Sequence, residues 1–172
     1  MVAIALINPK IAYNVAAALR ACSIFGAESL FWTGSRIPAP EQWPPGARLP
    51  REERMKLYSD VSMHGGLTVD HVLLSAKIND YCPVAVEKRA RAEMLDDFVH
   101  PEKALYVFGP EDGSLPRTVL EGAYRYVCIP TITQHSPLNL AAAVNVVLYD
   151  RLIKERRARN EGIPFSAGAY SG

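Results

Sequence analysis

Short apolar runs alternate with longer segments of mixed polarity along the chain, a pattern typical of strands that alternate with helices. Strands are expected at 2–7, 29–33, 83–86, 104–108 and 126–129. Helices are expected at 14–25, 51–60, 69–78, 116–123 and 138–157. Strands in such an order pair in parallel and are covered by helices on each side. The pattern therefore predicts an α/β fold with a mainly parallel sheet and helices on both faces.

Polar residues and glycines predict where several of these elements begin and end. Asn14 is expected to cap the first helix, and Gly26 is expected to end it. Ser136 followed by Pro137 predicts the start of the last helix, because a capping hydroxyl there precedes proline at the first helical position. Gly65-Gly66 is expected to interrupt the chain.

The chain has 172 residues, a formal net charge of +1 and three cysteines. This length suits a single domain, expected at 1–160, followed by a flexible glycine-rich tail at 161–172. The cysteines lack the spacing of metal ligands or of a disulfide framework, so we expect no metal site and a reducing cytoplasm. No apolar stretch approaches the roughly 20 residues of a membrane span, so no membrane partner is expected. The nearly neutral charge neither favours nor excludes nucleic acid, and an RNA partner would require positive charge gathered on one face.

The loop after the expected strand 104–108 contains the first candidate site residues. Gly109 would let a ligand approach the backbone, and Glu111 would place a carboxylate at the carboxyl edge of the sheet. Open α/β sheets bind their ligands at this edge. The same residues also suit an ordinary strand-to-helix turn. The loop matches neither GxGxxG nor the P-loop pattern, which argues against a nucleotide-phosphate site.

A second group of candidates lies around the start of the last expected helix. Ile129 ends a strand, and Asn139 precedes the small residues Ala141–Ala143. Because helix interiors mildly disfavour asparagine, the helix start at Ser136 does not explain Asn139. The small side chains would admit a flat ligand or another backbone, or would simply pack the helix on the sheet.

The first expected helix contains a third pair of candidates, Asn14 and Arg20. They are six residues apart, nearly two helical turns, and so do not lie on one stripe. Arg20 lies among Leu19, Ala21 and Cys22, and its side chain either extends to the surface or points into a polar site.

In this order, the three segments resemble the motifs of the SPOUT superfamily of RNA methyltransferases, in particular its SpoU/TrmH-like 2′-O-ribose branch. Residues 14–20 are similar to motif 1, residues 108–116 to motif 2, and residues 129–149 to motif 3. The nearest likeness is to the compact enzymes, which include those that methylate the tRNA wobble ribose. Three motifs in one order are more specific than any one of them.

The resemblance implies a parallel α/β domain with a deep C-terminal trefoil knot and an obligate homodimer. It also implies transfer of a methyl group from S-adenosylmethionine (AdoMet) to a ribose 2′-hydroxyl of RNA, with tRNA slightly favoured over rRNA. The positions that match the family's cofactor-binding residues are Val86, Gly109, Glu111, Ile129 and Leu138. The positions that match or replace its catalytic residues are Arg20, Asn14, Asn139 and Ser136.

The chain departs from the family pattern in three places. Motif 1 has Ala16 where glycine is common, and Pro137 replaces the usual serine of motif 3, with Ser136 one place earlier. The proline-rich segment 37–50 is not typical of the compact enzymes. Two alternatives therefore stay open. One is a catalytically silent knotted dimer that binds RNA or AdoMet, and the other is an unrelated α/β enzyme in which Glu111 and His135 form an acid–base pair.

Methyl transfer requires the 2′-hydroxyl to be aligned with the methyl carbon and to lose its proton. In the family, removal of this proton is assigned to the motif 1 arginine, helped by an RNA phosphate. Because arginine stays protonated in proteins, we expect Arg20 to bind the phosphate and stabilise the developing alkoxide, with Asn14 and Asn139 orienting it. Further candidate contacts to RNA are Lys10, Arg36, Arg48, Arg51, Arg54, Lys154, Arg156, Arg157 and Arg159.

Overall fold

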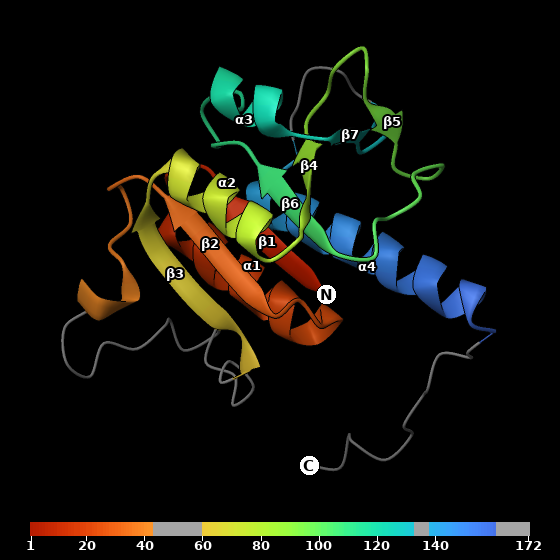
Figure 1. The fold of residues 1–172 in the computed structure, drawn as a ribbon, viewed down its shortest axis with the longest axis horizontal. Helices are drawn as coiled ribbons and strands as arrows, with labels where there is room; N and C mark the ends of the chain where they lie inside the picture. Colours follow the sequence, from red (N-terminus) through yellow and green to blue (C-terminus); the bar gives the residue numbers. More distant parts are fainter. Residues whose placement is uncertain (43–59, 133–137, 161–172) are drawn as a thin grey trace.

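The computed structural model of the chain describes residues 1–42, 60–132 and 138–160. Within these ranges seven strands form one sheet, and every pairing between them is parallel. The strands lie in the order β3-β2-β1-β6-β4-β7-β5 (Figure 1). Their bounds are β1 Val2–Leu6, β2 Ser29–Thr33, β3 Ser62–Leu67, β4 Cys82–Val86, β5 Glu93–Met94, β6 Ala104–Phe108 and β7 Arg125–Cys128. The predicted parallel sheet is confirmed.

Helices cover both faces of this sheet (Figure 1). They are α1 Ala12–Phe25, α2 Val69–Ile78, α3 Arg117–Gly122 and α4 Leu140–Ala158, with a short 3₁₀ turn at Pro40–Gln42. α1 and α4 pack against each other on one face, and α2 packs against α3 on the other. None of the helices in the described ranges has both the length and the apolar character needed to span a lipid bilayer.

The alternation of side chains along β1 divides the hydrophobic core into two halves. Val2, Ile4 and Leu6 belong to the half beneath α1 and α4. Ala3, Ala5 and their neighbours belong to the half beneath α2 and α3. β1 lies inside the sheet with helices on both faces, so all five of its residues are buried and its sequence is one apolar run.

Most elements occur where the sequence predicts them. Strands 29–33 and 104–108 and helix 69–78 match residue for residue, and the other predicted elements in the described ranges shift by at most two residues at either end. The predicted helix 51–60 lies almost wholly outside the described residues, as does most of the proline-rich segment 37–50. The predicted tail 161–172 also lies outside them.

The prediction that Gly65-Gly66 interrupts the chain is wrong, because both glycines lie within β3. At Gly65 the strand passes closely over a buried indole ring, and a Cβ atom there would lie 2.3 Å from Trp32 Cε2. Gly66 has φ +66°, in the left-handed region that favours glycine. β3 forms the edge of the sheet and exposes alternate side chains, so it lacks the apolar run of a central strand.

β5 is only two residues long, and no sequence pattern predicts it. It lies on the far side of β7 from β4, so two strands consecutive in the chain flank a later one. Val86 at the end of β4 and Glu93 at the start of β5 both pair with Val127 of β7. The connecting segment 87–92 therefore passes from one side of β7 to the other near the carboxyl edge of the sheet.

α1 begins two residues earlier than predicted, and the prediction that Asn14 caps it is wrong. The N-cap is Ile11, whose side chain makes no capping hydrogen bond. Instead, the distant carboxylate of Glu111 accepts hydrogen bonds from the backbone N–H groups of Lys10 (2.8 Å) and Ile11 (3.3 Å). The helix dipole favours a negative charge at this position. Gly26 ends the helix as predicted, with φ +77°.

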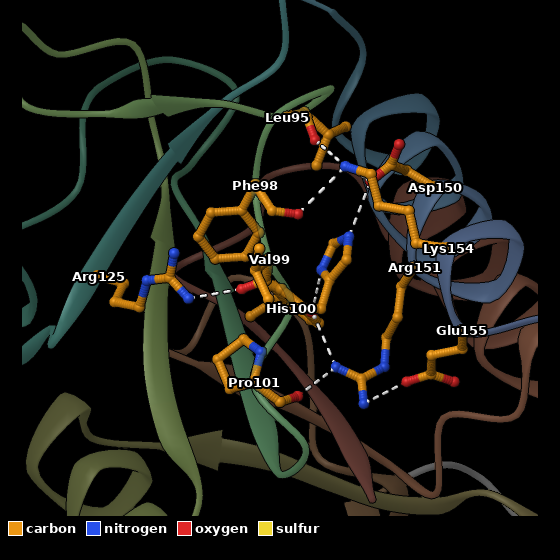
Figure 2. Close-up of polar contacts among 11 residues, drawn as sticks. Leu95, Phe98, Val99, His100, Pro101, Arg125, Asp150, Arg151, Lys154 and Glu155 are labelled. Carbon is orange, nitrogen blue, oxygen red and sulfur yellow. Dashed lines mark hydrogen bonds and ion pairs between the residues drawn. The ribbon is translucent and has the colours of Figure 1, made fainter. Parts of the chain in front are cut away.

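The second half of α4 is attached to the rest of the domain by buried polar contacts (Figure 2). Arg151 is only 5% exposed. Its guanidinium donates to the carbonyls of Pro101 (2.6 Å) and Glu102 (2.9 Å) and to the Tyr106 hydroxyl (3.1 Å). It also pairs with Glu155 one turn later, at 2.6 Å. Because these contacts hold α4 to the segment before β6, they also fix the position of its N-terminus, where Asn139 lies.

His100 completes this buried network. Its Nδ1 lies 2.6 Å from the Tyr106 hydroxyl and its Nε2 lies 2.8 Å from the Asp150 carboxylate, which also pairs with Lys154 at 2.7 Å. The contacts of Tyr106 and His100 are mutually consistent when Tyr106 accepts from Arg151 and donates to Nδ1, while a neutral His100 donates from Nε2 to Asp150. Burial lowers the pKa of His100 below its ordinary 6.5, against the opposing effect of Asp150.

Candidate active site

The predicted motif residues meet in a cavity at the carboxyl ends of β4 and β6. Its volume is about 540 Å³, within the range of small-molecule sites. α1, the segment after β6 and the start of α4 each form part of its wall. The described lining residues are Ile11, Asn14, Val86, Glu87, Phe108, Gly109, Pro110, Glu111, Gly113, Ser114, Leu115, Leu138, Asn139, Leu140 and Ala143.

A chain of hydrogen bonds joins the three motif segments across this cavity. Asn14 Nδ2 donates to Glu111 Oε1 at 2.8 Å, and Asn139 Nδ2 donates to Asn14 Oδ1 at 2.9 Å. Asn14 is only 2% exposed, so its amide is buried between its two partners. Because Asn14 lies 97 residues from Glu111 and 125 residues from Asn139 in sequence, this chain of hydrogen bonds fixes α1, the loop after β6 and α4 relative to one another.

Asn139 has a second role at the start of the last helix, which lies later in the chain than predicted. Its side-chain oxygen accepts from the backbone N–H groups of Ala141 (2.9 Å) and Ala142 (3.2 Å), so Asn139 is the N-cap of α4. The prediction that Ser136 and Pro137 begin this helix is therefore wrong. Asparagine is among the preferred N-cap residues, and its position outside the helical interior explains why it is tolerated there.

The Glu111 carboxyl is held in its ionised form. Burial alone would raise its pKa, but the hydrogen bonds from Asn14 and from the backbone N–H groups of Lys10 and Ile11 outweigh this effect and lower the pKa. A general acid or base works best with a pKa near the operating pH. The geometry therefore does not favour the alternative in which Glu111 acts with His135, which lies outside the described residues.

The loop after β6 approaches itself closely at Gly109. A Cβ atom on Gly109 would lie 3.3 Å from Leu115 N and 3.6 Å from Leu115 Cγ. The Leu115 N–H in turn donates to Glu87 Oε2 at 3.1 Å, which ties this loop to the end of β4. Glycine at 109 thus keeps the loop compact and leaves its backbone open to the cavity. No sequence signal marks Glu87, because a lone carboxylate after a strand is common.

Three predicted site residues are not among the described lining residues of the cavity. Arg20 is partly exposed on α1, about 9 Å further along the helix axis than Asn14. Ile129 follows β7 and packs against the core half beneath α1 and α4. Ser136 lies outside the described residues. The structure therefore brings Asn14, Val86, Gly109, Glu111, Leu138 and Asn139 together, with Arg20 two helical turns away.

Two of the cations that the sequence singled out as RNA contacts, Lys10 and Arg36, are engaged by an acidic residue of the loop after β6. Lys10 and Arg36 both pair with Asp112 of the loop after β6, at 3.8 Å and 3.0 Å. The hydrogen bond from Arg36 lowers the pKa of Asp112. Their charges are therefore partly neutralised. The run Lys88–Arg91 directly follows Glu87, and its three exposed cations were missed. Three positive residues within four positions is the signal that would have found it.

A second hollow of about 590 Å³ lies at the opposite edge of the sheet, near the amino ends of β4 and β7. Its wall includes Lys77, Tyr124 and Arg125. No described residue of the three motif segments lines it, so it does not compete as the site of the predicted chemistry. Among the described residues, no group of three or more His, Cys, Asp or Glu side chains could hold a metal ion.

Solved structures share this fold. The TrmH/SpoU tRNA modifying enzyme of A. aeolicus aligns with a TM-score of 0.75 and 18% identity, over 92% of this chain and 77% of that one. AviRb, a SpoU methyltransferase from Streptomyces viridochromogenes solved with AdoMet, aligns with a TM-score of 0.74 and 18% identity, over 94% and 58%. A structure that addresses the 2-OH methylation of C/U34 on tRNA aligns with a TM-score of 0.68 and 23% identity, over 90% and 91%.

Comparison of the sequence with known proteins and protein families identifies the family. Among curated proteins, none matches the sequence. The SpoU rRNA Methylase family does match, over residues 1–149, a range that contains all three motif segments and the described cavity wall. The shared fold, the meeting of the motifs in one cavity and this match over most of the chain agree with each other. The chain belongs to the SpoU rRNA Methylase family.

Proposed function

We propose that the protein transfers a methyl group from AdoMet to a ribose 2′-hydroxyl of RNA, with tRNA slightly favoured over rRNA. The observation that carries this proposal is the hydrogen-bond chain from Glu111 through Asn14 to Asn139, because it assembles three sequence-distant motifs around one cavity. The preference for tRNA is supported by the likeness to the structure that addresses C/U34 methylation, which has nearly the same length as this chain.

The cavity fits AdoMet in size and in chemistry. Its volume of about 540 Å³ suits a ligand of this size. Gly109, where a Cβ atom would crowd Leu115, leaves backbone groups open, and Val86 and Leu138 provide apolar contact for a flat ring. We infer that these residues hold the cofactor. Glu111 supports them by fixing the loop, since Asn14 and two backbone N–H groups occupy its carboxylate oxygens.

AdoMet, when bound, supplies a methyl group activated by a sulfonium. The protein must then align the ribose hydroxyl and stabilise the negative charge that develops on its oxygen. Arg20 is the residue we assign to this role. Because arginine stays protonated, its guanidinium binds a phosphate and the developing alkoxide and does not act as a base, so the hydroxyl proton leaves to water. Asn14 and Asn139 act by position, since each donates and accepts hydrogen bonds within the chain that fixes α1 and α4.

We also propose that the protein is a homodimer. Large apolar side chains are exposed on the outer side of the two adjacent helices α1 and α4. Tyr13 is 55% and Ile24 is 51% exposed on α1, and Val146 is 38% and Tyr149 is 55% exposed on α4. Exposed large apolar side chains on two helices that pack against each other are characteristic of interfaces. A second copy would cover it, and light scattering coupled to size exclusion would measure the mass of the assembly.

The C-terminal trefoil knot belongs to the same proposal. Its support is the strand order, in which β7 lies between β4 and β5 although those two strands are consecutive in the chain. The segment 87–92 must pass β7 to join them. After β7, the chain continues to α4, which packs against α1 at the opposite end of the sequence.

Transfer of a labelled methyl group tests the proposed reaction. The purified protein is incubated with methyl-labelled AdoMet and, in parallel, with unfractionated tRNA and with rRNA, and the RNA is then digested to nucleosides. The proposal expects the label on a 2′-O-methylnucleoside, more from tRNA than from rRNA, and its loss with Arg20→Ala. Label on a base would contradict the ribose specificity. Binding of AdoMet and RNA without any transfer would favour the silent dimer instead.

A further inference from the structure

We propose that the segment Lys88–Arg91, here called the basic loop, binds phosphates of the substrate RNA at the mouth of the cofactor cavity. This inference rests on the proposed function and names the surface through which the RNA docks. The basic loop contains Lys88, Arg89 and Arg91, separated only by Ala90. All four residues are exposed.

The position of the basic loop follows from the strand that precedes it. Val86, the last residue of β4, and Glu87 both line the cavity, and Lys88 comes next in the chain. Consecutive Cα atoms are about 3.8 Å apart, so the Arg89 Cα lies at most about 7.6 Å from that of Glu87. The loop then passes β7 to reach β5, which keeps it at the carboxyl edge of the sheet. Its cations therefore stand at the rim of the cavity.

The charges of the basic loop are free to meet an external partner. Within the part of the chain that the structure describes, no side chain of the basic loop forms a hydrogen bond or an ion pair. The two nearest carboxylates in sequence are engaged elsewhere. Glu87 accepts from Leu115 N, and Glu93 forms a bidentate pair with Arg125 at 2.7 Å.

Other cations in the described ranges are less suited to this role. Many are already paired with carboxylates: Lys10, Arg36, Lys103, Arg117, Arg125, Arg151 and Lys154. Arg157 and Arg159 lie at the far end of α4, and Arg157 is about 26 Å along the helix axis from Leu140 at the cavity. Among the residues that the structure describes, the basic loop is thus a concentration of unneutralised positive charge beside the cavity, on a chain with a net charge of +1.

The chemistry of the loop matches the RNA backbone. Three adjacent cations suit a row of phosphates, which carry one negative charge per nucleotide and bind mainly through counterion release. A single carboxylate, such as that of the cofactor's amino acid end, would need only one of them. A methyltransferase must also hold the backbone on either side of the target ribose so that the hydroxyl reaches the methyl group. The basic loop is placed to do this for a strand that crosses the cavity mouth.

Two variants with matched charge loss test the basic loop. Arg89→Gln/Arg91→Gln removes two charges from it, and Lys77→Gln/Lys103→Gln removes two from the opposite, amino edge of the sheet. The triple variant Lys88→Gln/Arg89→Gln/Arg91→Gln completes the set. Binding of fluorescently labelled unfractionated tRNA is measured by anisotropy across a range of salt concentrations, and AdoMet binding is measured by calorimetry.

We expect the triple variant to raise the Kd for tRNA about tenfold and to reduce the slope of log K against log salt by about 2, which is roughly 0.7 per lost phosphate contact. Arg89→Gln/Arg91→Gln should show most of the rise in Kd that the triple variant shows, whereas Lys77→Gln/Lys103→Gln should bind tRNA like the wild type. The Kd for AdoMet should stay within twofold in all three variants.

Several results would overturn the proposal. Equal weakening by both double variants would mean that only net charge matters, and wild-type tRNA binding by the triple variant would mean that the loop does not touch RNA. Loss of AdoMet binding with tRNA binding intact would assign the loop to the cofactor. A wild-type protein that does not bind tRNA would also refute it. The proposed function fails separately, when the wild type binds tRNA through the basic loop but transfers no methyl group to ribose.

Discussion

Replacing Asn14 with alanine removes the central link of the hydrogen-bond chain that holds the three motif segments together. The lost bond to the ionised Glu111 contributes about 1.5–3 kcal/mol, and the lost bond from Asn139 contributes about 0.5–1.5 kcal/mol. Glu111 keeps two backbone donors, Asn139 is exposed to water, and alanine favours a helix, all of which reduce the cost. We therefore expect Asn14→Ala to lower the free energy of unfolding by about 2 kcal/mol, or the Tm by about 4–8 °C for a chain of this size.

Urea denaturation and AdoMet calorimetry measure the consequences of this change. Asn145→Ala is the matched control, because its amide donates only to the Ala141 carbonyl of its own helix, and we expect a change within about 0.5 kcal/mol and unaltered AdoMet binding. Asn14→Ala should weaken AdoMet binding at least tenfold while the protein is still folded. A double-mutant cycle with Glu111→Ala should give a coupling of about 1.5 kcal/mol or more. Additivity within about 0.5 kcal/mol would refute the link.

Three further changes have definite expected outcomes. Gly65→Ala should lower the free energy of unfolding by about 3 kcal/mol, because its Cβ would overlap the buried Trp32 ring. Gly113→Ala, whose Cβ would make only an ordinary contact with Pro110 at 3.5 Å, should be nearly neutral in urea denaturation. Arg20→Lys keeps the charge but loses the planar fork, so methyl transfer should fall about a hundredfold, and a rate near that of the wild type would exclude this role. The lowered pKa of His100 means that the folded protein binds this proton less tightly than the unfolded chain does. The free energy of unfolding of the protein should therefore be highest above about pH 6.5 and decrease as the pH falls below that value, which urea midpoints would measure. His100→Gln should flatten this dependence, and parallel curves for both proteins would contradict it.

The sequence predicted much of the fold because the buried strands are short apolar runs with clear boundaries. β2 and β6 are buried on both sides, so burial and sequence pattern coincide residue for residue. β3 escaped prediction because an edge strand does not need apolar residues, and its glycines serve the contact with Trp32 instead of a turn. Local patterns therefore describe central strands well and edge strands poorly.

The sequence predicted most of the residues that form the candidate site, but not the contacts between them. Asn14 was expected as a helix cap and Asn139 as unusual in a helix interior, yet their bond to each other joins residues 125 positions apart, which no local pattern encodes. Glu111 was expected to face a ligand, whereas its oxygens are occupied by the start of α1. Glu87 has no sequence signal, and the basic loop has only its run of three cations in four positions, so their place beside the cavity is what distinguishes them.

A crystal structure of the protein with S-adenosylhomocysteine, the product left after methyl transfer, would show where the cofactor binds. If the motif segments assemble one cofactor site, the ligand will lie in the cavity between Val86, Gly109 and Leu138, with the bonds of Asn14 to Glu111 and Asn139 intact. A ligand bound elsewhere, such as in the hollow near Lys77 and Tyr124, with this cavity unchanged, would contradict the assignment of the site.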